Sequence, residues 1–462
     1  MLRDRYQRMN VFDIVSQAGL SMELELAQMD TLLDDDAVFQ KVKADLAKRY
    51  PHTTTTGRPS TPVEVVLRML VVKHLFGWSY EETERWVRDS LSLRQFCRVY
   101  LEAIPDDTTL LRWANLIQPD TLHSLLDHVT RLARTLKVTR GRKLRMDGTV
   151  VETNVHYPTD SSLLTDGVRV LSRTLKKAQA VLQRSASLAR EVFQDRRQSA
   201  RRQAKAIEDA LRQRGEQADQ MRQSAYRRLL SITQATVRQA QQVGTALREQ
   251  ATSVTTKLAD RLDHMRSLVE QVITQTTKRV LQGESVSADE KLVSLFEPHT
   301  AIIRKGKIHK PTEFGRMVWL SEVEGGIVSR YDILDGNPGD SEQFKPSLDH
   351  HIAVFTKPPH LVTADRGVFS FANEEYAHAQ GVKYVAIPKP GAISDERKAH
   401  EKQGWFRRGY AWRSGSEGRI SLLKRRFGLD RCRYHGDAGM ERWVGWGIIA
   451  HNLRVMARAA ST

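Results

Sequence analysis

The sequence predicts an α/β protein, in which a mixed sheet is flanked by helices, a helical N-terminal domain precedes the sheet, and a long helical insertion interrupts it. Residues 140–157 are rich in β-branched side chains, which favour strands. After Pro298 strand patterns return and alternate with helix patterns, as in α/β domains. Between these segments, residues 162–282 contain no proline and few glycines, which indicates helices.

The first predicted unit is a helical segment, residues 1–56. Its apolar residues recur at three- and four-residue spacing, as at Met29, Leu32 and Leu33. Residues 51–62 contain many helix breakers and are typical of a linker. We therefore expect initial helices that a linker separates from the next unit.

Residues 57–139 are predicted to form a compact helical domain. Pro62 can open a helix whose apolar face runs to Gly77. Ser79 and Glu82 then form a Ser-x-x-Glu capping box for the next helix. Short helices joined by tight turns resemble a helix-turn-helix DNA reader. Five arginines lie on them: Arg85, Arg88, Arg94, Arg98 and Arg112. Of these, Arg88 and Arg112 are our candidates for DNA contact. A plain helical bundle with solvated arginines is the alternative.

Residues 140–435 are predicted to form the α/β domain, followed by a C-terminal helix at 436–462. The expected elements are a strand that ends near Asp147 or continues beyond it, a hairpin of strands 316–323 and 327–334 around Gly325 and Gly326, a helix at 341–355, strands at 360–365 and 383–389, and a helix at 415–427.

A helical insertion at residues 162–296 interrupts this domain. Two or three helices are expected to fold back on one another near its glycines, which are Gly167, Gly215 and Gly244. The arginine-rich arm could lie along DNA or form a coiled-coil contact with a second subunit. A solvated structural arm is an equally good interpretation.

The composition favours a polyanionic partner. The chain has 72 Lys and Arg against 55 Asp and Glu, a net charge of +17, and nucleic acid is the most common partner for such an excess. Cys97 and Cys432 are its only cysteines, which excludes a disulfide framework and suits a reducing cytosol. The sequence shows neither a signal core nor a membrane span, so we expect a cytoplasmic protein.

Three acidic residues are candidates for catalysis. Asp147 and Asp365 each follow an apolar strand and precede a glycine-containing turn, and carboxylates at the carboxyl ends of neighbouring strands converge. Glu417 stands where a helix is expected to start. Three oxygen donors suit Mg²⁺ or Mn²⁺. Two such ions about 4 Å apart perform phosphoryl transfer. Either aspartate alone is weak evidence, because turns favour Asp.

The pattern around Glu417 is more specific. Tyr410, Arg413, Glu417 and Lys424 have the spacing Tyr-x2-Arg-x3-Glu-x6-Lys. On one helix, the last three share a face, so that the acid can hold a metal while the cations grip phosphates. An exposed salt bridge is the alternative.

Two tryptophans flank this pattern, Trp405 and Trp412. Either could stack against a base flipped out of DNA. The alternative is that they pack the helix onto the sheet, which is the more frequent role of large aromatic side chains.

Together these motifs resemble those of bacterial DDE insertion-sequence transposases. The spacing around Glu417 is similar to the signature of their catalytic glutamate, and the segments around Asp147 and Asp365 resemble their aspartate motifs. The resemblance extends over about residues 57–455. It implies an RNase H-like catalytic fold. By this implication the three carboxylates bind two Mg²⁺ ions, or Mn²⁺. Tyr410, Arg413 and Lys424 would then contact phosphates.

The resemblance also implies a function. Such an enzyme binds double-stranded DNA at the terminal inverted repeats of its mobile element, cleaves there as an endonuclease, and joins the ends to target DNA. We expect a homodimer, because two ends must be brought together, and a nucleoid-associated location. A nuclease without strand transfer, an inactive DNA-binding regulator derived from a transposase, and a coiled-coil scaffold are the alternatives. The sequence has no phosphate loop, so we expect no use of ATP.

Overall fold

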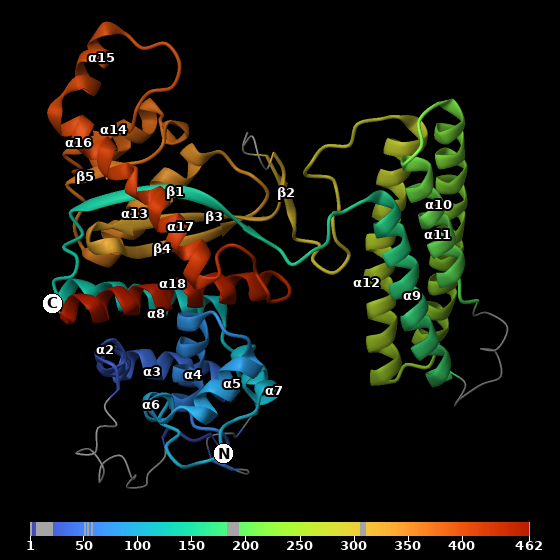
Figure 1. Ribbon diagram of the computed structural model, residues 1–462, viewed down its shortest axis with the longest axis horizontal. Helices are drawn as coiled ribbons and strands as arrows, with labels where there is room; N and C mark the ends of the chain where they lie inside the picture. Colours follow the sequence, from blue (N-terminus) through green and yellow to red (C-terminus); the bar gives the residue numbers. More distant parts are fainter. Residues whose placement is uncertain are drawn as a thin grey trace. The chain divides into compact units, whose positions relative to one another are not determined.

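The computed structural model of the protein describes residues 2–5, 22–49, 52, 55–56, 59–182, 194–304 and 311–461. The chain divides into two units: unit 1 is Met1–Asn154 with Gly315–Thr462, and unit 2 is Val155–Phe314. Figure 1 labels the helices and strands of each unit. Parts of two predicted helical regions, residues 6–21 and 183–193, lie outside the described residues.

Unit 1 begins with short helices around α4. The helices are α2 (Leu24–Leu33), α3 (Asp36–Ala47), α4 (Val63–Phe76), α5 (Tyr80–Asp89), α6 (Leu91–Phe96), α7 (Asp107–Ala114) and α8 (Pro119–Thr135). Pro62 is the N-cap of α4, and Gly77 ends it with a left-handed φ of 71°. The capping box of Ser79 and Glu82 opens α5. These predicted helix ends are confirmed.

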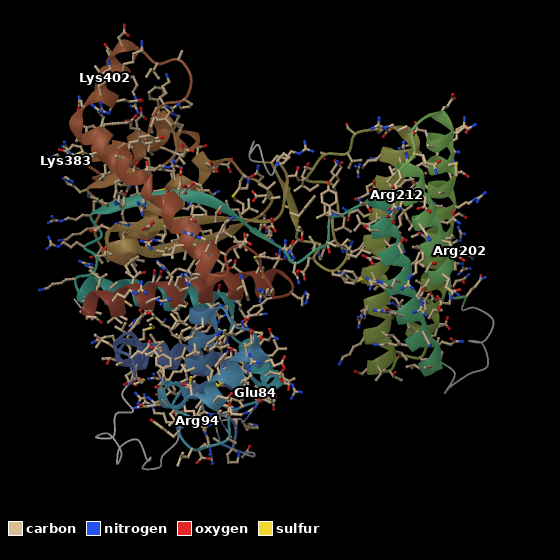
Figure 2. All side chains as sticks on the ribbon, viewed as in Figure 1. Glu84, Arg94, Arg202, Arg212, Lys383 and Lys402 are labelled. Carbon is tan, nitrogen blue, oxygen red and sulfur yellow. The ribbon has the colours of Figure 1, made fainter. Side chains whose placement is uncertain are left out.

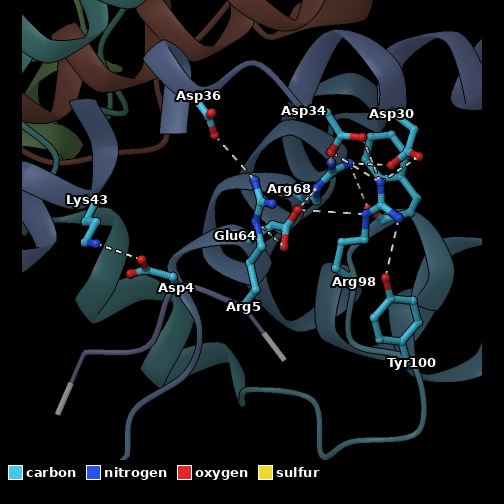
Figure 3. A network of polar contacts seen from close by, with 11 residues as sticks. Asp4, Arg5, Asp30, Asp34, Asp36, Lys43, Glu64, Arg68, Arg98 and Tyr100 are labelled. Carbon is cyan, nitrogen blue, oxygen red and sulfur yellow. Dashed lines mark hydrogen bonds and ion pairs between the residues drawn. The ribbon is translucent and has the colours of Figure 1, made fainter. Parts of the chain in front are cut away.

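A buried ion-pair network joins α2 to α4 (Figure 3). Arg68 of α4 is fully buried and donates to Asp30 at 2.5 Å and to Asp34 at 2.6 Å. Arg98 also contacts Asp30, at 3.0 Å. Arg94 donates to two backbone oxygens of the loop after α6. Arg94 and Arg98 therefore hold the helices and the following loop together.

The second half of unit 1 is built on a mixed sheet, as predicted (Figure 1). Its strands here are β1 (Lys143–Glu152), β3 (Glu313–Val323), β4 (Ile327–Leu334), β5 (Leu361–Thr363) and β6 (Tyr384–Ala386). The order is β3-β1-β5-β6, and β3 also pairs with β4 and with the short strand β2 (Ala301–Ile303). β3 is antiparallel to both β1 and β4, whereas β5 is parallel to both β1 and β6. The predicted hairpin is confirmed, and both Gly325 and Gly326 in its turn have positive φ.

β1 continues beyond Asp147, an outcome that the sequence left open. Asp147 pairs with Leu320 of β3, and the pairing continues to Glu152. Gly148, which suggested a turn, lies beside Trp319 instead, where an added Cβ would be 3.2 Å from the indole ring. A strand can use glycine to make room for a large cross-strand neighbour. Asp147 therefore lies inside a strand.

Helices cover the sheet. They are α13 (Phe344–Phe355), α14 (Phe371–Ala379), α15 (Asp395–Lys402), α16 (Gly404–Arg413), α17 (Gly415–Phe427) and α18 (Asp437–Ala460), with 3₁₀ turns at Asp340–Gln343 and Arg366–Val368. α8 and α18 lie side by side between the sheet and the N-terminal helices (Figure 1). α18 is buried along most of its length. One hydrophobic core thus joins the N-terminal helices to the sheet.

Unit 2 has a hydrophobic core of its own. Its described residues form α9 (Asp160–Leu182), α10 (Arg197–Leu211), α11 (Glu216–Glu249) and α12 (Ser253–Thr276), then a π-helical turn (Thr277–Gln282) and the short strand β2 (Ala301–Ile303). The described part of the insertion therefore has four helices, not two or three. Gly215 does precede a helix, but Gly167 and Gly244 lie inside α9 and α11. Gly167 fits against Val269, where a Cβ would be 2.8 Å from a methyl carbon, so it permits close packing and does not mark a turn.

Many of the arginines of unit 2 are exposed, including Arg202 and Arg212, which Figure 2 labels on its helices. Across both units, the helices in the described ranges all fall short of the combined length and apolar character needed to cross a membrane.

Candidate active site

Asp147 and Asp365 come from neighbouring parallel strands. β1 pairs with β5 up to Arg145 and Thr363, and each aspartate stands two residues beyond that pair. Asp365 has left the strand and caps the 3₁₀ turn, accepting from the backbone N–H of Arg366 at 2.7 Å. Parallel pairing therefore brings two carboxylates, 218 residues apart in the chain by their numbers, to one level of the sheet.

Glu417 and Ser416 approach from α17, which contacts β1. Glu417 lies in the first turn of this helix, as predicted, and its side chain is 72% exposed. Ser416 is buried and donates from its hydroxyl to Asp147 Oδ2 at 2.8 Å. The backbone N–H of Gly148 donates to Asp147 Oδ1 at 2.9 Å. Both oxygens of Asp147 are thus held by hydrogen bonds.

One guanidinium joins the three candidate carboxylates. Arg413 Nη2 lies 3.2 Å from Asp147 Oδ2 and 3.7 Å from Asp365 Oδ2, and Nη1 lies 3.3 Å from Glu417 Oε1. Its side chain is only 12% exposed. The exposed fraction of the acids rises from 17% for Asp147 to 50% for Asp365. Three acids from three separate elements therefore converge on a single positive charge.

The donor set suits a hard divalent cation, although it is not arranged around one. Within the described ranges, no three or more His, Cys, Asp or Glu side chains stand close enough to share a metal ion. The guanidinium of Arg413 lies among the three carboxylates instead. All three offer oxygen, the ligand that Mg²⁺ and Mn²⁺ prefer. Asp365 and Glu417 are 50% and 72% exposed. The residues thus fit such an ion in the chemistry of their donor atoms, while their positions in this structure are set around Arg413.

A buried charge network supports the site, and the sequence interpretation missed it. Arg145 lies two residues before Asp147 on the same face of β1 and donates to Glu322 at 2.7 and 2.9 Å. Arg419 of α17 contacts the same glutamate at 3.1 Å. Arg145 also donates to the backbone oxygen of Trp412 at 2.6 Å and lies over its indole at 4.7 Å. The network fixes the end of α16 and the start of α17 to the sheet. A charged residue inside the apolar segment KLRMD was the available signal, because a buried charge needs a partner.

The other predicted residues around Glu417 are dispersed. Tyr410 and Trp405 pack against Leu361, Ala386 and Phe406, where α16 covers the edge of the sheet. Trp405 lies 4.8 Å from the ring of Tyr384. Both tryptophans therefore have packing partners, Trp412 through Arg145 and Trp405 through the sheet.

Lys424 lies in the last turn of α17, away from the carboxylates. Because α16 ends at Arg413 and α17 begins at Gly415, the signature spans two successive helices, not one. On the N-terminal helices, Arg88 and Arg112 are exposed, and Arg88 pairs with Glu84 of its own helix.

Two family models match the chain. A "Transposase domain (DUF772)" matches residues 16–116, and a "Transposase DDE domain" matches residues 288–453. The chain belongs to the DDE transposases. The mixed sheet with flanking helices agrees with the RNase H-like fold of this family. The second match includes Asp365 and Glu417, whereas Asp147 lies between the two matched regions.

A curated relative is 30% identical over 128 residues, the "Uncharacterized protein ORF8 in nfe locus" of Rhizobium meliloti. The match covers 26% of this chain and 61% of the relative, so the chain spans less than two thirds of the relative's length. No solved structure matches the chain significantly.

Proposed function

We propose that the protein is a DNA transposase that cleaves the ends of its mobile element and joins them to target DNA, with Asp147, Asp365 and Glu417 as its catalytic residues. The observation that carries this proposal is the contact of one guanidinium, that of Arg413, with all three carboxylates. Three carboxylates that contact one cation offer oxygen donors of the kind that divalent ions prefer. The family to which the chain belongs gives this arrangement its reaction class.

The three carboxylates would hold divalent ions, Mg²⁺ or Mn²⁺, two to a site. Bound there, the ions supply activation of the attacking water or 3′-hydroxyl and stabilisation of the departing oxygen. Ser416 and the N–H of Gly148 orient Asp147. Arg413 balances the acids in the protein alone and, once released, can grip a DNA phosphate as a bidentate donor. Tyr410 and Lys424 are proposed phosphate contacts as well.

The substrate is proposed to be double-stranded DNA, first the terminal inverted repeats and then the target. The helices of residues 57–139 would bind the repeats, with exposed Arg88 and Arg112 facing the backbone. A homodimer would hold two ends at once. The net charge of +17 supports a polyanionic substrate and a place on the nucleoid.

The test is cleavage of a labelled duplex that carries the DNA flanking the gene, with Mg²⁺, by wild type and by Glu417→Gln. We expect end-specific nicking by wild type and its loss in the variant, with duplex binding retained. Glu396→Gln is the matched control, because Glu396 is also an exposed first-turn glutamate, in α15, outside the site. Equal nicking by both variants would refute the role of Glu417.

The same assay separates the alternatives. A product in which the cut end is joined to a second DNA molecule identifies a transposase, and cutting without joining identifies a nuclease. Binding by wild type without cutting, in Mg²⁺ and in Mn²⁺, would favour the DNA-binding regulator.

A further inference from the structure

Unit 1 contains a strongly basic groove away from the three carboxylates. Its volume is about 890 Å³, and it lies between the end of α4, the end of α17 with the loop that follows, and α18. Seven of its lining residues are Lys or Arg, and one, Asp430, is acidic. Such an imbalance in a concave site favours a polyanionic ligand.

The cations of the groove come from separate parts of the chain. Arg425 and Arg426 lie in the last turn of α17, are exposed, and form no ion pair with the described residues. Arg431 and Arg433 follow in the next loop. Cations in a last helical turn can serve the helix dipole alone. That explanation does not cover Arg433, which lines the same groove from the loop. Arg431 lines it too and contacts Glu152 at 2.9 Å, whereas the ammonium of Lys73 is buried against aromatic rings.

A row of aromatic side chains begins in the groove. Phe76 and Trp78 line it, and their rings stack at 4.5 Å with an angle of 18°. Trp86 of α5 continues the row at 5.9 Å and 23°. Phe76 is 43% and Trp86 44% exposed, although large apolar side chains normally avoid water. Arg85 lies over the ring of Trp86 at 5.5 Å, at the end of the row away from the groove. The other end of the row, the outer face of Phe76, is the one nearer the groove.

We propose that this groove binds single-stranded DNA, with phosphates along Lys424, Arg425, Arg426 and the loop arginines, and an unpaired base stacked on Phe76 at the end of the aromatic row. A basic groove beside exposed aromatic faces is the general solution for single strands, since every base has a face that can stack. A duplex backbone would use the cations but leave the row exposed. The proposal rests on the proposed function, because a DNA-cutting enzyme produces unpaired ends.

The test measures binding of a labelled oligothymidylate of about fifteen nucleotides, and of a duplex of equal length, to the full chain by fluorescence anisotropy. The buffer contains EDTA, so that cleavage has no part in the result. Phe76→Ala is expected to weaken single-strand binding by about tenfold, since one base stack is lost, and to leave duplex binding unchanged. Phe76→Leu keeps the buried apolar contact without the ring and should behave like the alanine variant if stacking is the cause.

The charge component is tested with Arg425→Gln/Arg426→Gln. This variant should flatten the dependence of log affinity on log salt by about 1.4, at about 0.7 for each phosphate contact on a single strand. Lys357→Gln/Lys383→Gln removes the same charge at exposed positions that precede β5 and β6, outside the groove (Lys383 is labelled in Figure 2), and should keep the wild-type slope. An unchanged slope in the arginine variant would overturn the proposal.

Two further outcomes are decisive. Equal loss of single-strand and duplex binding in Phe76→Ala would show that the row does not stack bases, and competition by polyglutamate as strong as by oligothymidylate would show a site for acidic chains. Both would overturn the inference. Single-strand binding by a wild type that never nicks duplex ends would support the groove and refute the proposed function. If wild type nicks duplex ends while the groove variants bind single strands as well as wild type does, the proposed function would be supported and the groove proposal refuted.

Discussion

Replacing Lys73 by methionine is expected to stabilise unit 1. Lys73 is 2% exposed, and its ammonium lies 4.7, 5.0 and 5.2 Å from the ring centres of Tyr80, Tyr434 and Trp443. The described residues give it no acidic partner within ion-pair distance. Burial, helped by the nearby charge of Arg433, lowers its pKa from 10.5 to about 7. At about 1.36 kcal/mol for each pH unit, charging Lys73 in the fold costs about 5 kcal/mol.

The three rings return part of this cost, because a desolvated cation–π contact stabilises by about 2 kcal/mol. Methionine fills a similar volume and contacts aromatic rings favourably. We therefore expect Lys73→Met to raise the free energy of unfolding by about 1–3 kcal/mol at pH 7.

The pH dependence follows from the lowered pKa. Above pH 10.5 the lysine is neutral in both the folded and the unfolded chain, and no charging cost arises. Between pH 10.5 and pH 7 the unfolded chain binds the proton first, so the wild type loses stability as the pH falls. The advantage of Lys73→Met is therefore largest at or below pH 7 and shrinks towards pH 10.5. Glu82 and Cys432, which face the lysine, act in the opposite direction to burial.

Urea unfolding followed by tryptophan fluorescence at pH 7, 8 and 9 measures this effect. All eight tryptophans lie in unit 1, so the signal reports that unit alone. A gain in stability that stays constant from pH 7 to 9, or a loss at pH 7, would refute the reasoning about Lys73.

Three other perturbations have clear expected outcomes. Arg68→Met should cost about 3–5 kcal/mol in urea unfolding, because it leaves the acidic partners of Figure 3 without their buried cation; an unchanged midpoint would contradict this. Burial lowers the pKa of His351 to about 4 and of His451 to about 3. These neutral groups therefore favour the fold above pH 6.5, and that contribution is lost as the pH falls. The Tm of wild type should drop between pH 6.5 and 4, and the drop should be shallower for His351→Gln. Gly409→Ala should destabilise unit 1 by about 1–3 kcal/mol and reduce nicking, because the new Cβ would lie 2.8 Å from a side chain of β6 and push α16 outward. Gly418→Ala is the control: its Cβ meets nothing within 4 Å, so it should be tolerated in both assays.

Local signals in the sequence were sufficient for several elements. Gly77, the capping box at Ser79 and the two glycines of the β3–β4 turn each act within a few residues, and the structure places them as predicted. Glycine was misread where its role depends on a distant partner. Gly148 serves Trp319 across the sheet and Gly167 serves Val269 on another helix, and neither neighbour can be inferred from local pattern.

The candidate site shows the same division. The position of Glu417 in a first helical turn follows from local sequence, but the register that aligns Asp147 with Asp365 depends on strand pairing across the whole insertion. Arg145 and Glu322 escaped notice because each looks like an isolated charge until β1 and β3 are paired. The roles of the carboxylates stay predictions until cleavage is measured.

The pairing of Glu152 with Gly315 has a topological consequence. The chain departs from the sheet and re-enters it at facing positions on adjacent strands, so unit 2 occupies the place of a hairpin loop. A module attached in this way can be acquired, lengthened or lost in a lineage without rethreading the strands, as insertions at exposed loops are tolerated elsewhere. The long interval between the two aspartates in the sequence therefore does not separate them in the sheet, where each stands two residues beyond the same parallel pair.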